Sequence, residues 1–203
     1  KALFDLMEAF YALTPPTRLK MRSEVLTGTW ETLVSGQADL AIGVPGDRIA
    51  HPGIRVEPLG EIEFILCVAP HHPLAKAAEP LDPCVLAQHR IVAVADSARG
   101  LEPVTVGILP GQDVLTVPSM STKLEAQLRG IGCGFLPTAM VQPYLDAGQL
   151  VHKQVDHPPR RAKIHYAWRQ PSGQPGHALA WWLQQLESPK TRQALLDLHE
   201  GLV

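Results

Sequence analysis

The sequence has no excess of charge of either sign, no long apolar run and few cysteines. Its 203 residues carry a formal net charge of −2. A domain that binds duplex DNA presents a clustered basic face, so this balance argues against DNA binding by the chain itself. No apolar run approaches the roughly 18 residues of a membrane helix. The amphipathic start KALFDLMEAFYAL also lacks the apolar core of a signal peptide, so we expect no membrane partner.

The cysteines and the missing motifs argue against an enzyme. Cys67, Cys84 and Cys133 are widely spaced and form no CxxC pair, which favours buried free thiols in a reducing cytoplasm over a metal site or disulfide. The sequence has no GxSxG, HExxH or GxxxxGK[ST] motif. Its Gly130–Gly134 stretch, GIGCG, follows a predicted helix and is therefore no dinucleotide fingerprint. We expect no catalytic residues, metal or cofactor.

The chain does contain one pattern twice. Glu24–Gly43 (EVLTGTWETLVSGQADLAIG) has the order strand end, polar turn, short helix, glycine and buried strand, and Leu115–Pro137 (LTVPSMSTKLEAQLRGIGCGFLP) repeats it. Each helix begins just past the carboxyl end of a strand, the edge at which open parallel sheets bind ligands. The repetition predicts two α/β lobes with a ligand-binding cleft between them.

Periodicity places the remaining elements. Helices are expected at 2–13, from Thr29, from Thr122, and at 177–186 and 189–202. Thr29 is predicted to cap the first repeated helix, and Thr122 to cap the second in a capping box with Glu125. The predicted strands cover 19–25, 38–44, 64–69 (FILCVA, within Leu59–Pro70), 90–95, 115–117, 134–136 and 163–169. The alternation of strands and helices predicts an α/β fold in which each lobe is a mostly parallel sheet flanked by helices.

Four motifs in this order resemble the effector-binding region of LysR-type transcriptional regulators. They are Leu33–Gly43 (LVSGQADLAIG), Val68–Ala75 (VAPHHPLA), Pro118–Pro137 and Tyr144–Val151 (YLDAGQLV). The resemblance implies a two-lobed fold like that of periplasmic (type 2) solute-binding proteins, with a small-molecule effector between the lobes. It makes aromatic compounds and carboxylates the expected effector classes. An extracytoplasmic solute-binding protein of a transporter is the alternative.

The resemblance also implies partners and boundaries. The full regulator would contact DNA through a winged helix-turn-helix, which this sequence lacks, and it would form a homodimer or tetramer. Residues 2–13 and the region Leu124–Ile131 are the candidate dimer contacts. We expect lobe I to comprise residues 1–68 plus 168–203, without the family's first strand, and lobe II residues 69–167.

The two repeated helix starts supply the candidate effector site. Helix N-termini carry unpaired N–H groups and partial positive charge, and two of them facing one cleft would suit a carboxylate or a polarised carbonyl. Plain helix capping is the simpler alternative for the same hydroxyls. Ser97 follows a predicted strand and Phe135 is a candidate apolar wall, although either also fits a turn or the core. The expected effector-binding residues are Thr27, Gly28, Thr29, Trp30, Ser97, Ser119, Met120, Ser121 and Phe135.

Overall fold

The computed structural model describes residues 2–13, 16–46, 51–170 and 173–197. Its helices are α1 (Ala2–Ala12), α2 (Thr27–Val34), α3 (Pro83–Ala87), α4 (Met120–Leu128), α5 (Thr138–Asp146), α6 (His177–Glu187) and α7 (Pro189–Asp197), with a 3-10 turn, η1 (Pro73–Lys76). Its strands are β1 (Leu40–Pro45), β2 (Ile54–Val68), β3 (Ile91–Val94), β4 (Val114–Val117), β5 (Gly134–Pro137), β6 (Val151–Lys153) and β7 (Arg160–Arg169).

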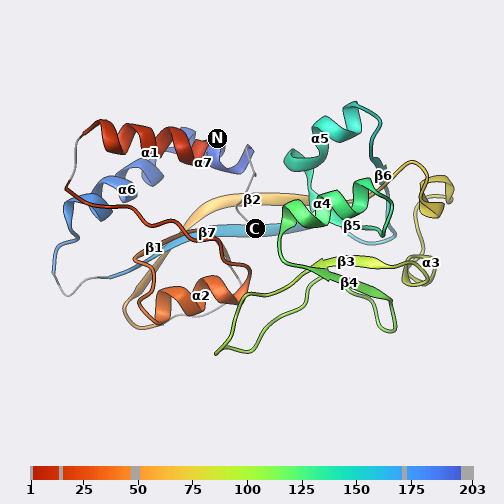
Figure 1. The fold of residues 1–203 in the computed structure, drawn as a ribbon, viewed down its shortest axis with the longest axis horizontal. Coiled ribbons are helices and arrows are strands. Elements are labelled where there is room, and N and C mark those ends of the chain that lie inside the picture. The colour runs from red at the N-terminus through yellow and green to blue at the C-terminus, as the bar shows by residue number, and fades with distance from the viewer. Residues whose placement is uncertain (1, 14–15, 47–50, 171–172, 198–203) are drawn as a thin grey trace.

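Two long strands run through the whole molecule and join its two lobes. β2 and β7 pair antiparallel from Ile54↔Arg169 to Phe64↔Arg160. Helices α1, α2, α6 and α7 gather at one end of this pair and form lobe I, whereas α3–α5 and β3–β6 gather at the other end and form lobe II (Figure 1). β1 adds to β7 in lobe I, and β5 and β6 add to β2 in lobe II.

Helices cover both faces of the sheet in lobe I. On one face, α6 and α7 bury Leu186 and Leu195 against Leu59 and Ile62 of β2 and Ile164 of β7. On the other face, α2 buries Trp30 and Leu33 against β1 and β7. Burying each large apolar side chain contributes about 2 kcal/mol, so these two layers hold lobe I on the connecting strands.

Lobe II is built around the carboxyl end of β2, where Leu66, Cys67 and Val68 are all buried. This unbroken apolar run is covered on both sides. Cys67 packs with the α4 and α5 side chains, whereas Leu66 and Val68 pack with Leu74 and its neighbours. The pair β3–β4 lies beside this core and is extended by the bridge Ile91↔Cys133.

The expected parallel sheets are not confirmed. β3–β4 is a parallel pair, but every ladder in the five-stranded sheet β1-β7-β2-β5, with β6 on β2, is antiparallel. That sheet also continues from one lobe into the other instead of forming one sheet per lobe. The reason is that β2 and β7 are long enough to cross between the lobes and carry the shorter strands along their edges.

Three local predictions also differ from the structure. Residues 19–25 pair with no other strand. Some of their backbone N–H groups donate to side chains instead, as Leu19 N does to the Tyr11 hydroxyl at 3.2 Å. Cys84 is exposed, unlike the buried Cys67 and Cys133, because the short helix α3 buries only Leu86. The sequence patterns do not predict β6, α3, α5 or η1, and the other expected elements are present, most with shifted ends. The last part of the helix expected at 189–202 lies outside the described residues.

Candidate functional site

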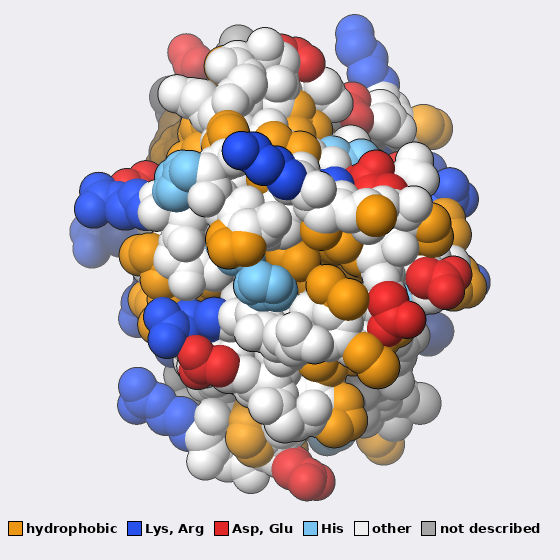
Figure 2. All heavy atoms as spheres, turned by 90° about the vertical axis from the view of Figure 1, so that its right-hand side faces the viewer, with side chains coloured by type: hydrophobic (Ala, Val, Ile, Leu, Met, Phe, Trp, Pro, Cys, Tyr) orange, Lys and Arg blue, Asp and Glu red, His pale blue; other side chains and the backbone are white. Residues whose placement is uncertain are grey.

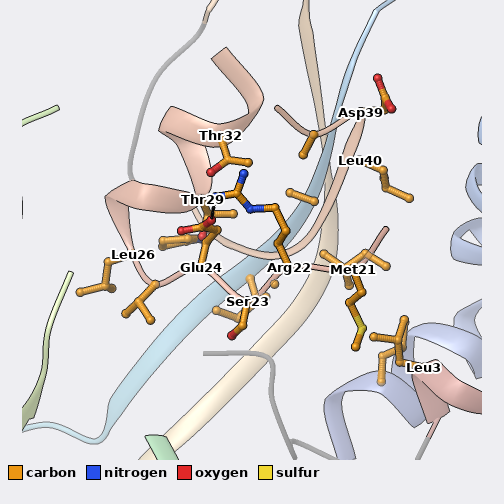
Figure 3. Close-up of a pocket in the computed structure, with 18 of the residues that line it drawn as sticks. Leu3, Met21, Arg22, Ser23, Glu24, Leu26, Thr29, Thr32, Asp39 and Leu40 are labelled. Carbon is orange, nitrogen blue, oxygen red and sulfur yellow. Dashed lines mark ion pairs between the residues drawn. The ribbon is translucent and has the colours of Figure 1, made fainter. Parts of the chain in front are cut away.

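A cavity of about 1650 Å³ lies where the lobes meet. Lobe I contributes the segment Thr17–Leu26, the edge of β1 and part of α2. The lobe II side includes Val94, Met120, Lys123 and Phe135, and β7 contributes residues 160–164 between them. Figure 3 shows the lobe I side, with the ion pair of Arg22 and Glu24 (2.9 Å) beside Thr29 and Thr32. Both lobes and a connecting strand therefore line one site.

The structure brings three of the expected effector-binding residues to this cavity, namely Thr29, Met120 and Phe135. Trp30 is fully buried in the lobe I core instead. The remaining expected residues lie next to the cavity lining rather than in it; they are Thr27, Gly28, Ser97, Ser119 and Ser121.

The N-terminus of α2 is already occupied by a side chain from lobe II. The helix begins at Thr27, two residues before the expected cap Thr29, and its N-cap Leu26 has φ 51° and no side-chain capping bond. The Asp96 carboxylate, just past β3, accepts hydrogen bonds from the N–H groups of Thr27 (3.1 Å) and Gly28 (3.1 Å). Thr29 is therefore not the cap, because an acidic side chain distant in sequence takes that role.

Further hydrogen bonds join the same two segments. Ser97 Oγ accepts from Val25 N at 2.8 Å and donates to Glu24 Oε2 at 2.9 Å. Glu31 Oε2 on α2 accepts from the N–H groups of Arg99 (2.7 Å) and Gly100 (3.0 Å). We call this set, with Asp96, the interlobe latch; its members are Glu24, Val25, Thr27, Gly28, Glu31, Asp96, Ser97, Arg99 and Gly100.

Glycine is required within the interlobe latch, and hydrogen bonds lower the pKa of two of its three acids, Asp96 and Glu31. A Cβ on Gly28 would lie 2.0 Å from Ser97 Oγ, so a larger residue would separate the two segments. Burial acts to raise the pKa of Asp96, but hydrogen bonds from backbone N–H groups, Val104 and Ala98 first, outweigh it and leave that pKa below its usual value. The N–H groups of Gly100 and Arg99 likewise lower the pKa of Glu31.

The N-terminus of α4 caps itself. Ser119, not the expected Thr122, is the N-cap, and its Oγ accepts from Thr122 N at 3.1 Å. Ser119 has the extended backbone of a cap, whereas Thr122 already lies inside the helix. The hydroxyls of Ser121 and Thr122 each lie 2.9 Å from Ser119 Oγ, so the three hydroxyls mainly serve one another.

Two cations on the lobe II side were missed by sequence reasoning. Lys123 of α4 is only 8% exposed, and the Arg160 guanidinium lies 5.0 Å from the centre of the Phe135 ring. Burial, with the charge of Arg160 as a second cause, lowers the pKa of Lys123 to about 8. A lysine in the first turn of a helix opposes the helix dipole, which was the available sequence signal.

Comparison with known proteins identifies the family. A family model described as the LysR substrate binding domain matches residues 1–188. The chain belongs to this LysR family. The HTH-type transcriptional regulator YeeY of Escherichia coli (strain K12) is 35% identical over 184 residues, which are 91% of this chain and 59% of that protein. This LysR domain thus spans about three fifths of the length of that relative.

Solved LysR-family structures share the fold. The regulatory domain of MetR from N. meningitidis is 18% identical, with a TM-score of 0.66 over 96% of this chain and 88% of that chain. Full-length LysG from Corynebacterium glutamicum, with bound effector Arg, is 19% identical, with a TM-score of 0.62 over 89% of this chain and 60% of that chain. The expected family and its two-lobed, periplasmic-binding-protein-like fold are thereby confirmed.

Neither a metal-binding cluster nor a membrane-spanning helix is present among the described residues. Within the described ranges, no group of three or more His, Cys, Asp or Glu side chains is arranged to hold a metal ion. None of the described helices combines the length and apolar character needed to cross a membrane.

Proposed function

We propose that this LysR domain senses a small-molecule effector in the cavity between its lobes and passes the signal to a DNA-bound regulator. The observation that carries the proposal is the cavity of about 1650 Å³ lined by both lobes and by β7. Drug-sized ligands occupy sites of roughly 300–1,000 Å³, so the effector would fill part of it. The LysG structure, which holds Arg as its effector, supports a small-molecule effector for this domain.

The effector would act by binding one arrangement of the lobes more tightly than another. The effector can shift the interlobe latch, because its hydrogen bonds connect Asp96 to the start of α2 and Ser97 to Val25, just before α2. The proposed division assigns residues 1–68 plus 168–203 to lobe I and residues 69–167 to lobe II. Of the effector-binding residues expected from the sequence, Thr29, Met120 and Phe135 are the proposed contacts.

The proposed regulator is cytoplasmic, carries no enzymatic activity and works as a homodimer or tetramer. α1 supports the oligomer, since Phe4 is 62% exposed and Tyr11 is 50% exposed on this helix. Ile131, just past α4, is 44% exposed and supplies a second apolar contact. DNA would be bound by a winged helix-turn-helix elsewhere in the regulator. A transporter-type solute-binding protein is not favoured, because the relatives are named as transcriptional regulators.

A ligand screen tests the proposal. Thermal unfolding of the protein with a library of metabolite-sized acids, amines and aromatic compounds should reveal at least one compound that raises Tm, since a ligand that binds only the native state stabilises it. Phe135→Ala should weaken that compound by roughly tenfold in calorimetry. Tyr144→Ala, on α5 away from the cavity lining, is the control. Equal affinity of the Phe135 variant and the wild type would place the ligand elsewhere.

A further inference from the structure

The geometry points to an anion site on the lobe II wall of the cavity, formed by the Lys123 ammonium and the Arg160 guanidinium, for a carboxylate or phosphate group of the effector. This inference rests on the proposed function, because it names the chemistry of the same cavity. It goes further in naming which wall binds the charged group. The two cations come from α4 and from β7, so one anion bound between them would contact lobe II and a strand that continues into lobe I.

The position of Lys123 has three costs that the described chain does not offset. The ammonium group is on a side chain that is only 8% exposed. It lies in the first turn of α4, where the helix dipole disfavours positive charge. The positive charge of Arg160 adds to this cost, because it also disfavours the charged form of Lys123. Among the described residues, no Asp or Glu lies within ion-pair distance of Lys123 or Arg160.

The lysine is nevertheless accommodated in a defined place. A Cβ on Gly134 would lie 2.9 Å from Lys123 Cε, so the absence of a side chain on this β5 residue makes room for the lysine stem. Burial raises the pKa of the nearby Cys133 thiol to about 11, so that thiol is neutral and does not balance the ammonium charge at pH 7. A buried cation with room but no counterion indicates that the counterion comes from outside the chain.

Arg160 is held in a similar way. Its guanidinium stacks on Phe135 at 5.0 Å from the ring centre, and a Cβ on Gly107 would lie 2.6 Å from Arg160 Nη1. These contacts restrain the guanidinium from two sides without neutralising it. A restrained guanidinium presents two parallel donors, which match a carboxylate or phosphate.

The charge of the whole cavity agrees with this assignment. Eight lysine and arginine residues line it, against two acidic residues, Glu24 and Asp39. The chain as a whole has a net charge of −2, so the cations are concentrated in the cavity. By contrast, the outer end of lobe II shows positive and negative side chains interspersed (Figure 2). A concave site of one sign attracts ligands of the other sign.

The two helix N-termini are poorer candidates for the anion. Asp96 already binds the first N–H groups of α2, and a second anion there would be repelled by that carboxylate. Ser119 caps α4 with its own hydroxyl. The described cavity therefore offers the cationic pair rather than the helix starts.

Matched acids and amides test the inference. Benzoate, succinate and inorganic phosphate would be titrated against the protein by calorimetry and thermal unfolding, with benzamide and succinamide as uncharged probes. We expect the oxyanions to bind more tightly than the amides. Lys123→Met and Arg160→Met should each weaken the oxyanions about tenfold or more, as for loss of a charge-assisted hydrogen bond, and leave the amides unchanged. The carboxylates and phosphate form separate arms that identify the preferred oxyanion.

Arg129→Gln is the control, because Arg129 ends the same helix, is 70% exposed and does not line the cavity. It should bind the oxyanions like the wild type. If Lys123→Met and Arg160→Met bind them like the wild type, the anion site is overturned. If, in that case, the amides bind the wild type as tightly as the oxyanions do, the cavity remains an effector site and only its proposed charge preference fails.

A second readout needs no ligand. Since Lys123 is a buried cation without a counterion, Lys123→Met should unfold at a higher temperature than the wild type in the absence of small molecules. A structural lysine with internal partners would give the opposite result. A lower Tm of Lys123→Met, together with unchanged oxyanion binding, would overturn the inference even if the variant were partly misfolded.

Discussion

The two helix starts that face the junction of the lobes differ in how their charges are balanced. At α2, every charged group has a partner across the junction: Asp96 accepts N–H groups of Thr27 and Gly28, and Glu31 accepts those of Arg99 and Gly100. At α4, the helix caps itself with Ser119. Lys123 in its first turn and Arg160 of β7 have no ion-pair partner among the described residues. One side is satisfied within the chain and the other is not.

This difference separates a structural role from a binding role. Buried polar groups that are paired stabilise the fold, whereas an unpaired buried charge costs free energy and persists where a ligand uses it. The hydrogen bonds at the start of α2 thus have the features of a structural contact between the lobes. The unpaired cations near the start of α4 have the features of an anion-binding site. The predictions below test each side with changes that should act in opposite directions.

The largest expected effect comes from the pH dependence of Lys123. Its pKa is about 8 in the folded protein, against an ordinary value of 10.5. The unfolded chain therefore holds this proton more tightly than the folded protein. Below pH 8 this lowers the free energy of unfolding by up to about 3 kcal/mol, and the loss disappears as the pH rises to 10.5. Lys123→Met has no ammonium group at this position and therefore lacks this pH-dependent loss of stability. Its stability advantage over the wild type, measured by urea unfolding, should be largest at pH 7 and shrink toward pH 10.

The neighbouring titratable groups do not reverse this expectation. Burial lowers the pKa of Arg160 on β7 from an ordinary value of 12.5, and it raises the pKa of the Cys133 thiol to about 11. The comparison of variant with wild type also cancels titration elsewhere in the chain. An advantage of Lys123→Met that is independent of pH would show that the ammonium is already balanced in the folded state.

Removing Asp96, which accepts the N–H groups at the start of α2, should have the second largest effect on stability. Asp96→Ala removes the acceptor of the N–H groups of Thr27, Gly28, Ala98 and Val104, and should lower the free energy of unfolding by about 2 kcal/mol. The pKa of Asp96 is lowered in the folded state, so its contribution is present above the ordinary value of 3.8 and is lost as the pH falls through the folded value. Urea unfolding at pH 7 measures the loss.

Asp113→Ala serves as the comparison for Asp96. Asp113 is 63% exposed and makes an ion pair with Arg90 at 2.8 Å, so its removal should cost about 0.5 kcal/mol or less. Equal losses for both variants would mean that the interlobe latch adds nothing beyond an ordinary surface contact.

The sequence predicted the elements better than the site. Continuous apolar runs such as 64–69 and the repeated strand–turn–helix pattern give local signals, and they located β2, β3, β5, α4 and the family. The direction of the ladders depends on how far β2 and β7 extend, which no local pattern encodes. Residues 19–25 alternate between apolar and polar side chains as a strand would, but they pair with no other strand, because no local pattern supplies a partner.

The site depended on contacts between residues distant in sequence. Thr29 and Thr122 fit the cap rules locally, but Asp96 lies about 69 residues from the helix that it caps. Lys123 and Arg160 are separated by α5, β5 and β6, so nothing in the sequence placed one beside the other. Met120 and Phe135, which the sequence predicted from the repeated motif, line the cavity, and their contact with an effector stays a prediction.

A smaller effect should come from filling the space behind Lys123. In Gly134→Ala the new Cβ would lie 2.6 Å from Gln127 Nε2, 2.9 Å from Lys123 Cε and 3.1 Å from the Val92 carbonyl oxygen, which cannot easily move. We expect a loss of about 1 kcal/mol in stability and weaker binding of the oxyanion probes, because the lysine must shift. Gly173→Ala, where no atom lies within 4 Å, is the control. Normal binding by Gly134→Ala would show that the position of the lysine stem is not critical.

The smallest effect concerns Glu31, which shares the satisfied side with Asp96 but acts on a different stretch of backbone. Its carboxylate accepts from the N–H groups of Arg99 and Gly100, whereas Asp96 holds those of Thr27 and Gly28. Glu31→Ala should therefore speed amide hydrogen exchange at Arg99 and Gly100 and leave Thr27 and Gly28 protected. Glu31→Gln retains an acceptor and should give intermediate rates. Exchange measured residue by residue by NMR distinguishes this from a common opening, in which all four amides would accelerate together and the interlobe latch would behave as one cooperative unit.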